Sequence, residues 1–282
     1  RKTGLLAPTF SVNSKLGLDL TAPYYINLAP NRDVTLYPRI VGRRGVQLGT
    51  EFRFLSKKQA GEIGLQLLPS DRITSKDRWL ARASHTFRLS SQNSLGLSAI
   101  RVSDNNYFAD FGASVLAASQ RILPATVQIN GNFQGWQYLT VFQKYQVLQD
   151  PGAPILPPYE WSPRIRFSNN HILKINKFDV DSSGVFEMTH FTHPSMAEGT
   201  RIVGDANFSS PFLAGGVRFK PQFGMHLTSY SHSKNGSQEL TQNRFGISNS
   251  LIGVYANNVG DTPSYSRILP SISVEASSVL ER

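Results

Sequence analysis

Apolar and polar residues alternate with a period of two along most of this chain. In the segment from 45 to 55, the two sets are Val46, Leu48, Phe52 and Phe54 on one side and Gln47, Gly49, Glu51 and Arg53 on the other. The same alternation recurs near 79–89, 126–133 and 217–228. Because successive side chains of a β-strand point to opposite faces, the pattern predicts a sheet with one apolar and one polar face.

The predicted strands are long, and turn-forming residues separate them. Several exceed ten residues, whereas strands in soluble sheets average about 5–6 and a tilted strand needs about 9–11 residues to cross a bilayer. Short turns alternate with longer connections near 104–114, 149–163, 192–199 and 231–262. The chain therefore supplies about 14 antiparallel strands. This indicates an all-β, transmembrane outer-membrane β-barrel, present in part.

The composition agrees with a sheet that has lipid on one face and water on the other. Hydrophobic residues make up 40% of the 282 residues and charged residues only 17%, against about 25% charged in soluble domains. There is no run of apolar residues long enough for a transmembrane helix, and no cysteine. The net charge of +10 points to anionic partners such as nucleic acid, anionic lipid or an anionic glycolipid. The basic residues are dispersed over alternating strands, so nucleic acid is not expected.

Aromatic residues gather near the ends of the predicted strands, as in the interfacial girdles of membrane barrels. They are Tyr24, Tyr25, Tyr37, Trp79, Trp136, Tyr138, Tyr159 and Trp161. Aromatic residues are also simply common in strands. A soluble β-sandwich is the structural alternative, but long strands with charges in mid-strand favour the membrane barrel over it.

Four prolines interrupt the first predicted strands, at positions 8, 23, 30 and 38. Proline cannot donate a hydrogen bond to a sheet, so ordinary strands avoid it. The prolines therefore mark either strand ends and bends, or a strand pair whose hydrogen bonding is weak.

Six motifs resemble the barrel domain of the LPS-assembly protein family LptD, also called OstA or Imp. They are RKTGLLAPTFS (1–11), PYYINLAPNRDVTLYPR (23–39), RRGVQLGTEFRFL (43–55), DPGAPILPPYEWSPRI (150–165), GTRIVGDANFSSP (199–211) and RILPSISVEASSVLER (267–282). The last motif has Glu275-Ala276-Ser277 where the family tends to have Asp-Ser-Gly. The resemblance implies that residues 1–282 are the N-terminal portion of a barrel of about 26 strands. Such a portion forms an open curved sheet or closes on itself.

The resemblance implies transport rather than catalysis, in the outer membrane of a Gram-negative cell. It implies that lipopolysaccharide passes from periplasmic bridge proteins, which act through a preceding domain, into the barrel and out into the membrane lipid. It also implies a lipoprotein plug, LptE, in the lumen. No catalytic residue, metal or cofactor is expected, because no nucleophile elbow, phosphate-binding glycine loop or metal-ligand pattern occurs.

Two sets of residues are candidates for function. The family match places Pro8 and Pro23 at a lateral gate, the weakly bonded junction beside the first strand. Each proline removes a hydrogen-bond donor from this junction. Basic residues at polar positions would point into the lumen and could bind lipopolysaccharide phosphates: Arg53, Arg82, Arg88, Arg164, Arg166, Arg218 and Lys220. Each of these could instead pair with Glu51, Glu62 or Glu187 across the wall.

Two other functional classes remain open. A porin or gated uptake barrel would share the alternation but needs no prolines in the first strand pair. A soluble carbohydrate-binding module or all-β enzyme would need no detergent to stay monodisperse.

Overall fold

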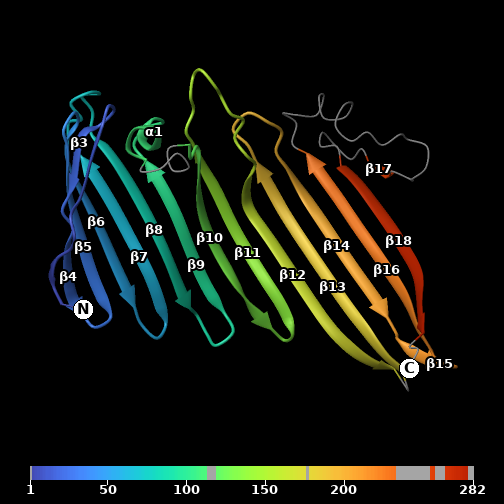
Figure 1. The fold of residues 1–282 in the computed structure, drawn as a ribbon. Coiled ribbons are helices and arrows are strands. Elements are labelled where there is room, and N and C mark those ends of the chain that lie inside the picture. Colours follow the sequence, from blue (N-terminus) through green and yellow to red (C-terminus); the bar gives the residue numbers. More distant parts are fainter. Residues whose placement is uncertain (1, 113–118, 176–177, 233–254, 258–263, 279–282) are drawn as a thin grey trace. The chain divides into compact units, whose positions relative to one another are not determined.

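The computed structural model describes residues 2–112, 119–175, 178–232, 255–257 and 264–278 (Figure 1). The predicted connection at 231–262 therefore lies mostly outside the described residues. The chain divides into two compact units. Unit 1 contains residues 1–128 and 143–158, and unit 2 contains residues 129–142 and 159–282.

Unit 1 is an antiparallel sheet in which strands adjacent in sequence pair with one another. Its elements are β1 (Gly4–Leu5), β2 (Thr9–Asn13), β3 (Gly17–Thr21), β4 (Tyr24–Ala29), β5 (Arg32–Val41), β6 (Gly45–Leu55), β7 (Gln59–Leu68), β8 (Arg78–Arg88), β9 (Ser94–Val102) and the helix α1 (Tyr107–Phe111). The strands β10 (Ile122–Phe133) and β11 (Trp136–Val147) each carry residues of both units.

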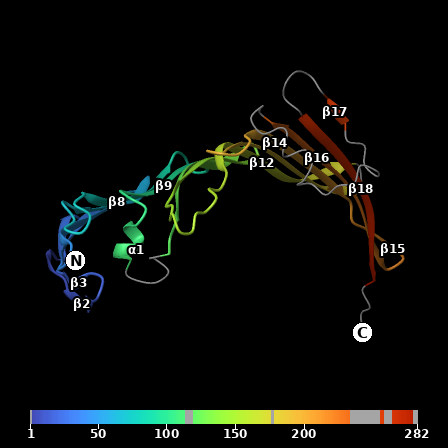
Figure 2. The ribbon, with the colours of Figure 1, turned by 90° about the horizontal axis from the view of Figure 1, so that it is seen from above.

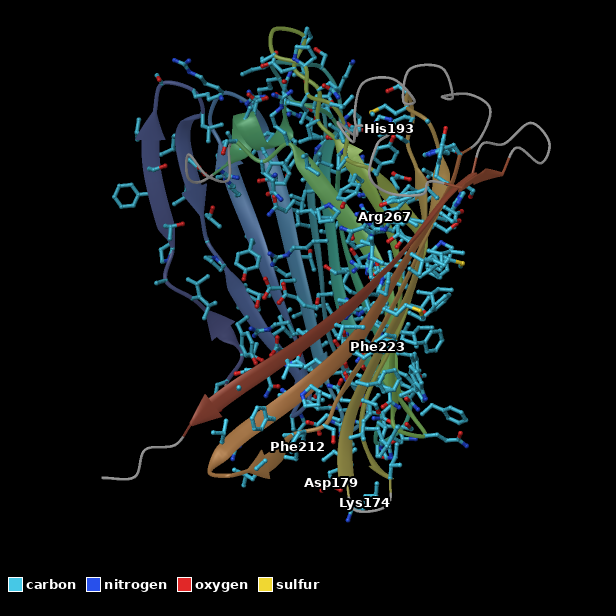
Figure 3. The ribbon with its side chains drawn as sticks, turned by 90° about the vertical axis from the view of Figure 1, so that its right-hand side faces the viewer. Lys174, Asp179, His193, Phe212, Phe223 and Arg267 are labelled. Atoms are coloured by element: carbon cyan, nitrogen blue, oxygen red, sulfur yellow. The ribbon has the colours of Figure 1, made fainter. Side chains whose placement is uncertain are left out.

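Unit 2 is also antiparallel and has the longest strands. They are β12 (Glu160–Ile175), β13 (Phe178–Thr192), β14 (Gly199–Ser209), β15 (Phe212–Ala214), β16 (Val217–His232), β17 (Tyr255–Asn257) and β18 (Ser264–Ser278). Lys174 and Asp179 face each other where β12 turns into β13, and His193 lies beyond the opposite end of β13 (Figure 3).

The predicted fold class is confirmed. In the described residues, β1–β4 are two strands that are each interrupted once, β5–β14 are ten more, and β16 and β18 are two. They give the 14 long strands that the sequence predicted, with β15 and β17 as short additions. No helix among the described residues is long and apolar enough to cross a membrane.

The two faces of each sheet differ as the alternation predicted. We call the side that carries Val46, Leu48 and Ile63 in unit 1 and Phe223 and Ile268 in unit 2 the apolar face. These side chains are exposed, Val46 by 60% and Ile268 by 60%. Such extensive exposed apolar surface is unusual for a soluble monomer but is the pattern of a lipid-facing strand. We call the opposite side the charged face.

The aromatic girdle is correct only in part. Tyr24, Trp79 and Trp136 are exposed. The prediction is wrong for Tyr25 and Tyr37, which share the charged face with Arg39 and Asp33 in the register of β4 and β5. The Tyr25 hydroxyl donates to Asp33 Oδ2 at 3.3 Å. Neighbouring positions of a strand point to opposite faces, so Tyr24 and Tyr25 cannot both belong to one girdle.

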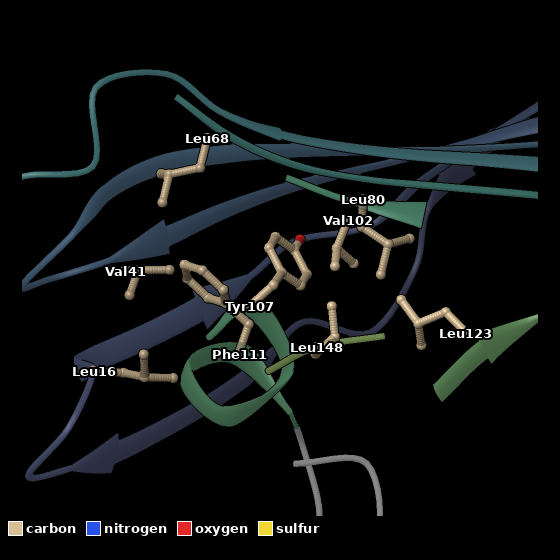
Figure 4. Packing of buried hydrophobic residues seen from close by; sticks show 9 residues of the cluster. All are labelled: Leu16, Val41, Leu68, Leu80, Val102, Tyr107, Phe111, Leu123 and Leu148. Carbon is tan, nitrogen blue, oxygen red and sulfur yellow. The ribbon is translucent and has the colours of Figure 1, made fainter. Parts of the chain in front are cut away.

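A small core lies at one end of unit 1, on the charged face. The connection after β9 folds back so that α1 covers the sheet (Figure 2), and Tyr107 and Phe111 are buried. Around them pack Leu16, Val41, Leu68, Leu80, Val102, Leu123 and Leu148 (Figure 4). The sequence predicted a polar connection at 104–114. A five-residue helix is too short to show the 3.6-residue periodicity that would have revealed it.

Candidate functional site

The strand formed by β1 and β2 and the strand formed by β3 and β4 are both interrupted at the same level. Residues 6–8 separate β1 from β2, and residues 22–23 separate β3 from β4. Pairing between the two strands ends at Leu5 with Tyr24 and resumes at Thr9 with Thr21. Three residues on the first strand thus oppose two on the second, which is the count of a β-bulge. By contrast, β5 and β6 pair without a break.

Two hydrogen bonds lie at the interruption, one between the two interrupted strands and one from residue 22 to β5, and each is only half of a normal pair. The Leu6 N–H donates to the Pro23 carbonyl at 2.8 Å, and the Ala22 N–H donates to the Pro38 carbonyl at 3.1 Å. In an antiparallel sheet such opposed residues exchange two bonds. Pro23 and Pro38 have no N–H to return. One donor is therefore missing between the first and second strands, at Pro23, and another is missing between the second strand and β5, at Pro38.

The predicted gate prolines lie at this interruption. Pro8 is exposed in the bulge, and Pro23 is buried immediately before β4. Pro38 was not among the predicted gate residues. The Pro38 carbonyl faces Ala22 of the first hairpin, residues 4–29. In an antiparallel sheet the amide nitrogen and the carbonyl of one residue point to the same neighbouring strand. Pro38 therefore weakens the junction with the first hairpin and leaves the pairing of β5 with β6 intact.

Two of the predicted cations in unit 1 are neutralised by acids on strands β5, β6 and β7 of the same sheet. Arg53 Nε lies 2.9 Å from Asp33 Oδ1. Arg82 lies 2.5 Å from Glu51 Oε2 and 2.9 Å from Glu62 Oε1. The contacts form a ladder of alternating charge along the charged face of β5 to β8.

In unit 2, one carboxylate serves three arginines. Glu187 is almost buried, and it lies 2.7 Å from Arg164, 3.8 Å from Arg166 and 2.9 Å from Arg201. Arg201 was not predicted, although Arg201, Asp205 and Asn207 alternate with Ile202, Ala206 and Phe208 along β14, so the same rule could have found it. This cluster keeps a surplus of positive charge.

The remaining predicted cations lie nearer the strand ends. Arg88 ends β8 and is exposed, and its backbone N–H donates to the Lys58 carbonyl. Arg218 and Lys220 face Ser277 and Glu275 in the register of β16 with β18. The structure thus does not bring all seven predicted residues together. Arg164 and Arg166 share Glu187, and Arg53 and Arg82 share Glu51.

Beside α1, five charged residues form a network that the sequence did not reveal. Arg78 contacts Asp71 at 3.2 Å, Asp104 at 2.7 Å and Asp110 at 2.6 Å. Arg44 contacts Asp71 at 2.7 Å and Asp110 at 2.9 Å. Both guanidinium groups also lie over the Phe111 ring. The guanidinium carbon is 5.1 Å from the ring centre in Arg44 and 4.8 Å in Arg78. The network connects three loops at the same end of unit 1.

Burial and hydrogen bonding set the protonation of this network. Burial raises the pKa of Asp71, but the Ile73 N–H, Arg44 and Arg78 outweigh it and hold that pKa below its ordinary value. The pKa of Asp104 is also lowered, because hydrogen bonds from Ser103 and Arg78 outweigh burial. Burial raises the pKa of Tyr107 to about 12. The Tyr107 hydroxyl therefore stays protonated, donating to Gln66 and accepting from Gln47.

Acid is expected to loosen this end of unit 1. A carboxylate whose pKa is lowered on folding contributes stability above its unfolded pKa of about 4, and this is lost as the pH falls through the lower folded value. The full-length protein in detergent should therefore show a falling unfolding temperature between neutral pH and about pH 3. Asp71→Asn should begin lower at neutral pH and fall less on acidification. Parallel curves for the two proteins would contradict the assignment.

Comparisons with known proteins agree with this architecture. The family model described as LptD: LPS transport system D matches residues 76–282. An LPS-assembly protein LptD from Bordetella avium is 36% identical over 100% of this chain, and those from Ralstonia nicotianae and Thiobacillus denitrificans are 34% identical over 82% and 85% of it. The chain spans 34%, 28% and 32% of these relatives' lengths.

An antiparallel sheet with an exposed apolar face, a charged face and an interrupted first hairpin defines part of a β-barrel wall of the outer-membrane class. Within that class, the chain belongs to the LptD family of LPS-assembly proteins.

Proposed function

We propose that this chain forms part of the wall of an outer-membrane translocon that inserts lipopolysaccharide into the outer leaflet. In this proposal the first hairpin, residues 4–29, is one side of a lateral gate, and the role is transport rather than catalysis. The observation that carries it is the loss of reciprocal hydrogen bonds at Leu6–Pro23 and Ala22–Pro38.

A junction with missing hydrogen bonds opens easily because the apolar face lies against lipid rather than water. In the hydrocarbon region water does not replace a lost hydrogen bond, so a strand junction is normally held by every backbone group. A junction that already lacks donors has fewer bonds to break when it opens. Lipid chains could leave through such a junction directly onto the apolar face.

The charged face is suited to carry the polar part of lipopolysaccharide while the lipid chains leave on the apolar face. Arg53 and Arg82 are neutralised within the wall, so their main role is structural. Arg164 and Arg166 share one carboxylate with Arg201, which leaves positive charge for phosphate groups. Arg88, Arg218 and Lys220 could add weaker contacts along the same face. An LptE-like lipoprotein in the lumen and periplasmic bridge proteins complete the proposed assembly.

Restoring a donor to the junction between the first and second strands tests the gate. In the full-length protein, Pro23→Ala allows an N–H to return the bond to Leu6, so less lipopolysaccharide should reach the cell surface and the outer membrane should admit more of a large hydrophobic antibiotic. Pro30→Ala is the matched control because Pro30 lies in the β4–β5 turn. Equal surface delivery by the two variants would count against the gate.

A further inference from the structure

We propose that the apolar face of β5–β8 carries a binding site for the headgroup of an anionic phospholipid, and that Arg32 is the residue that binds the lipid phosphate. The site lies at the strand ends that the β4–β5 and β6–β7 turns connect. None of its residues belongs to the first hairpin, so the inference goes beyond the proposed gate and does not depend on it.

Arg32 begins β5 on the apolar face. It faces Phe54 in the register of β5 with β6, and Val34 faces Phe52 in the same register. Residues directly opposite each other on two paired strands share one face of the sheet. The adjacent acid, Asp33, points to the charged face, where it pairs with Arg53. The Arg32 side chain is exposed, and no acidic residue in the described part of the chain pairs with it.

The apolar face of β5–β8, all of which the structure describes, holds two ionisable side chains, Arg32 and His85. The other positions that share this face are apolar, apart from Thr50, Gln59 and Gly61. Both ionisable residues lie toward the same strand ends. A charged side chain on the lipid face is costly at the bilayer midplane and costs little near the interface. We therefore place this end of the apolar face at the level of the lipid headgroups.

A row of half-buried rings continues from Arg32 across these strand ends. The centre of the Phe54 ring lies 5.5 Å from that of Phe52 and 5.3 Å from that of His85. Gly61 lies between them on β7, and a Cβ atom at Gly61 would come within 2.5 Å of the Phe54 ring. His85 Nε2 lies 3.2 Å from Gln59 Oε1. Rings that combine an apolar body with a polar edge suit the boundary between lipid tails and headgroups.

The turns at this end are short and basic. Residues 30–31 join β4 to β5 and residues 56–58 join β6 to β7, whereas the longer connection 69–77 lies at the opposite strand ends (Figure 1). Short turns face the periplasm in bacterial outer-membrane barrels. Lys57 and Lys58 are exposed in the β6–β7 turn, and neither turn contains an acidic residue. Together with Arg32 they give this end three positive charges.

This arrangement matches a phospholipid of net negative charge. The guanidinium group presents parallel N–H donors that fit a phosphate, and each basic residue near an anionic membrane surface contributes about 1 kcal/mol of attraction. A lipid whose phosphate binds Arg32 has apolar surface for its acyl chains beyond the rings, where Ile63 and Leu65 are exposed. The two lysines favour an anionic headgroup over a zwitterionic one.

Lipid titration of the full-length protein in mild detergent tests the site, with bound phosphatidylglycerol counted by native mass spectrometry. Arg32→Gln should lower the affinity about fivefold, which corresponds to ~1 kcal/mol. Arg32→Lys keeps the charge but loses the planar fork, so its affinity should lie between those of the native protein and Arg32→Gln. Lys57→Gln with Lys58→Gln should reduce the preference for phosphatidylglycerol over phosphatidylcholine.

The matched control is Arg43→Gln, because Arg43 is exposed in the turn at the other end of β5. It should bind phosphatidylglycerol as the native protein does, and heat-dependent migration on gels checks that each variant is folded. Equal affinities of Arg32→Gln and Arg43→Gln, or an Arg32→Lys variant as weak as Arg32→Gln, would overturn the proposal. Inorganic phosphate is the second probe. If it raises the unfolding midpoint as much as phosphatidylglycerol does, and through Arg32, the site binds simple anions and the lipid assignment fails.

Discussion

Replacing Arg78 with methionine is expected to destabilise unit 1 by about 3–5 kcal/mol, the cost of removing one partner from a buried ion pair. The Arg78 side chain is only 2% exposed and binds Asp71, Asp104 and Asp110. Without it, Arg44 alone must compensate Asp71, and Asp104 loses its guanidinium partner. Methionine keeps most of the volume over the Phe111 ring, so the loss reports on charge rather than on packing.

The measurement is the unfolding midpoint of the full-length protein in detergent, followed by heat-dependent migration on gels. Lys76→Met is the control because Lys76 is exposed in the same loop, and surface substitutions usually change stability by less than about 0.5 kcal/mol. Equal midpoints for the Arg78 and Lys76 variants would show that the network does not hold this end of the unit together.

The fold could be predicted because its determinants are local. Alternation in segments such as 45–55 specifies which residues share a face, and turn residues between segments mark the strand ends. Neither signal depends on distant residues. Faces were misassigned where adjacent aromatics were read as one group, as with Tyr24 and Tyr25.

The site could be predicted less completely, because it depends on register. The partners of Arg53 and Arg82 were foreseen in part: Glu51 and Glu62 were named as possible partners, whereas Asp33 was not. The role of Pro38 follows only from its position opposite Ala22, which sequence alone does not give. The contact of Lys15 with Asp110 joins residues 95 positions apart in the chain, and no local pattern encodes such a contact.

Glu187→Leu is expected to have the second large effect, a loss of about 3 kcal/mol, at the lower end of the cost of breaking a buried pair because the three arginines are partly exposed. The Glu187 side chain is 8% exposed, whereas Arg164, Arg166 and Arg201 are 27%, 43% and 34% exposed. Removing the carboxylate leaves three guanidinium groups beside one another on the charged face. Their mutual repulsion adds to the loss of the pairs.

The same substitution distinguishes a structural carboxylate from one that also tunes anion binding. Three uncompensated arginines should bind added phosphate, and a ligand that binds only the folded protein raises stability. Phosphate should therefore raise the unfolding midpoint of Glu187→Leu more than that of the native protein or of Glu275→Gln, an exposed carboxylate opposite Lys220. An equal phosphate response in all three proteins would mean that this cluster does not offer an anion site. In that case the proposed phosphate contacts at Arg164 and Arg166 would have to be abandoned, while the structural role of Glu187 would stand on the midpoint alone.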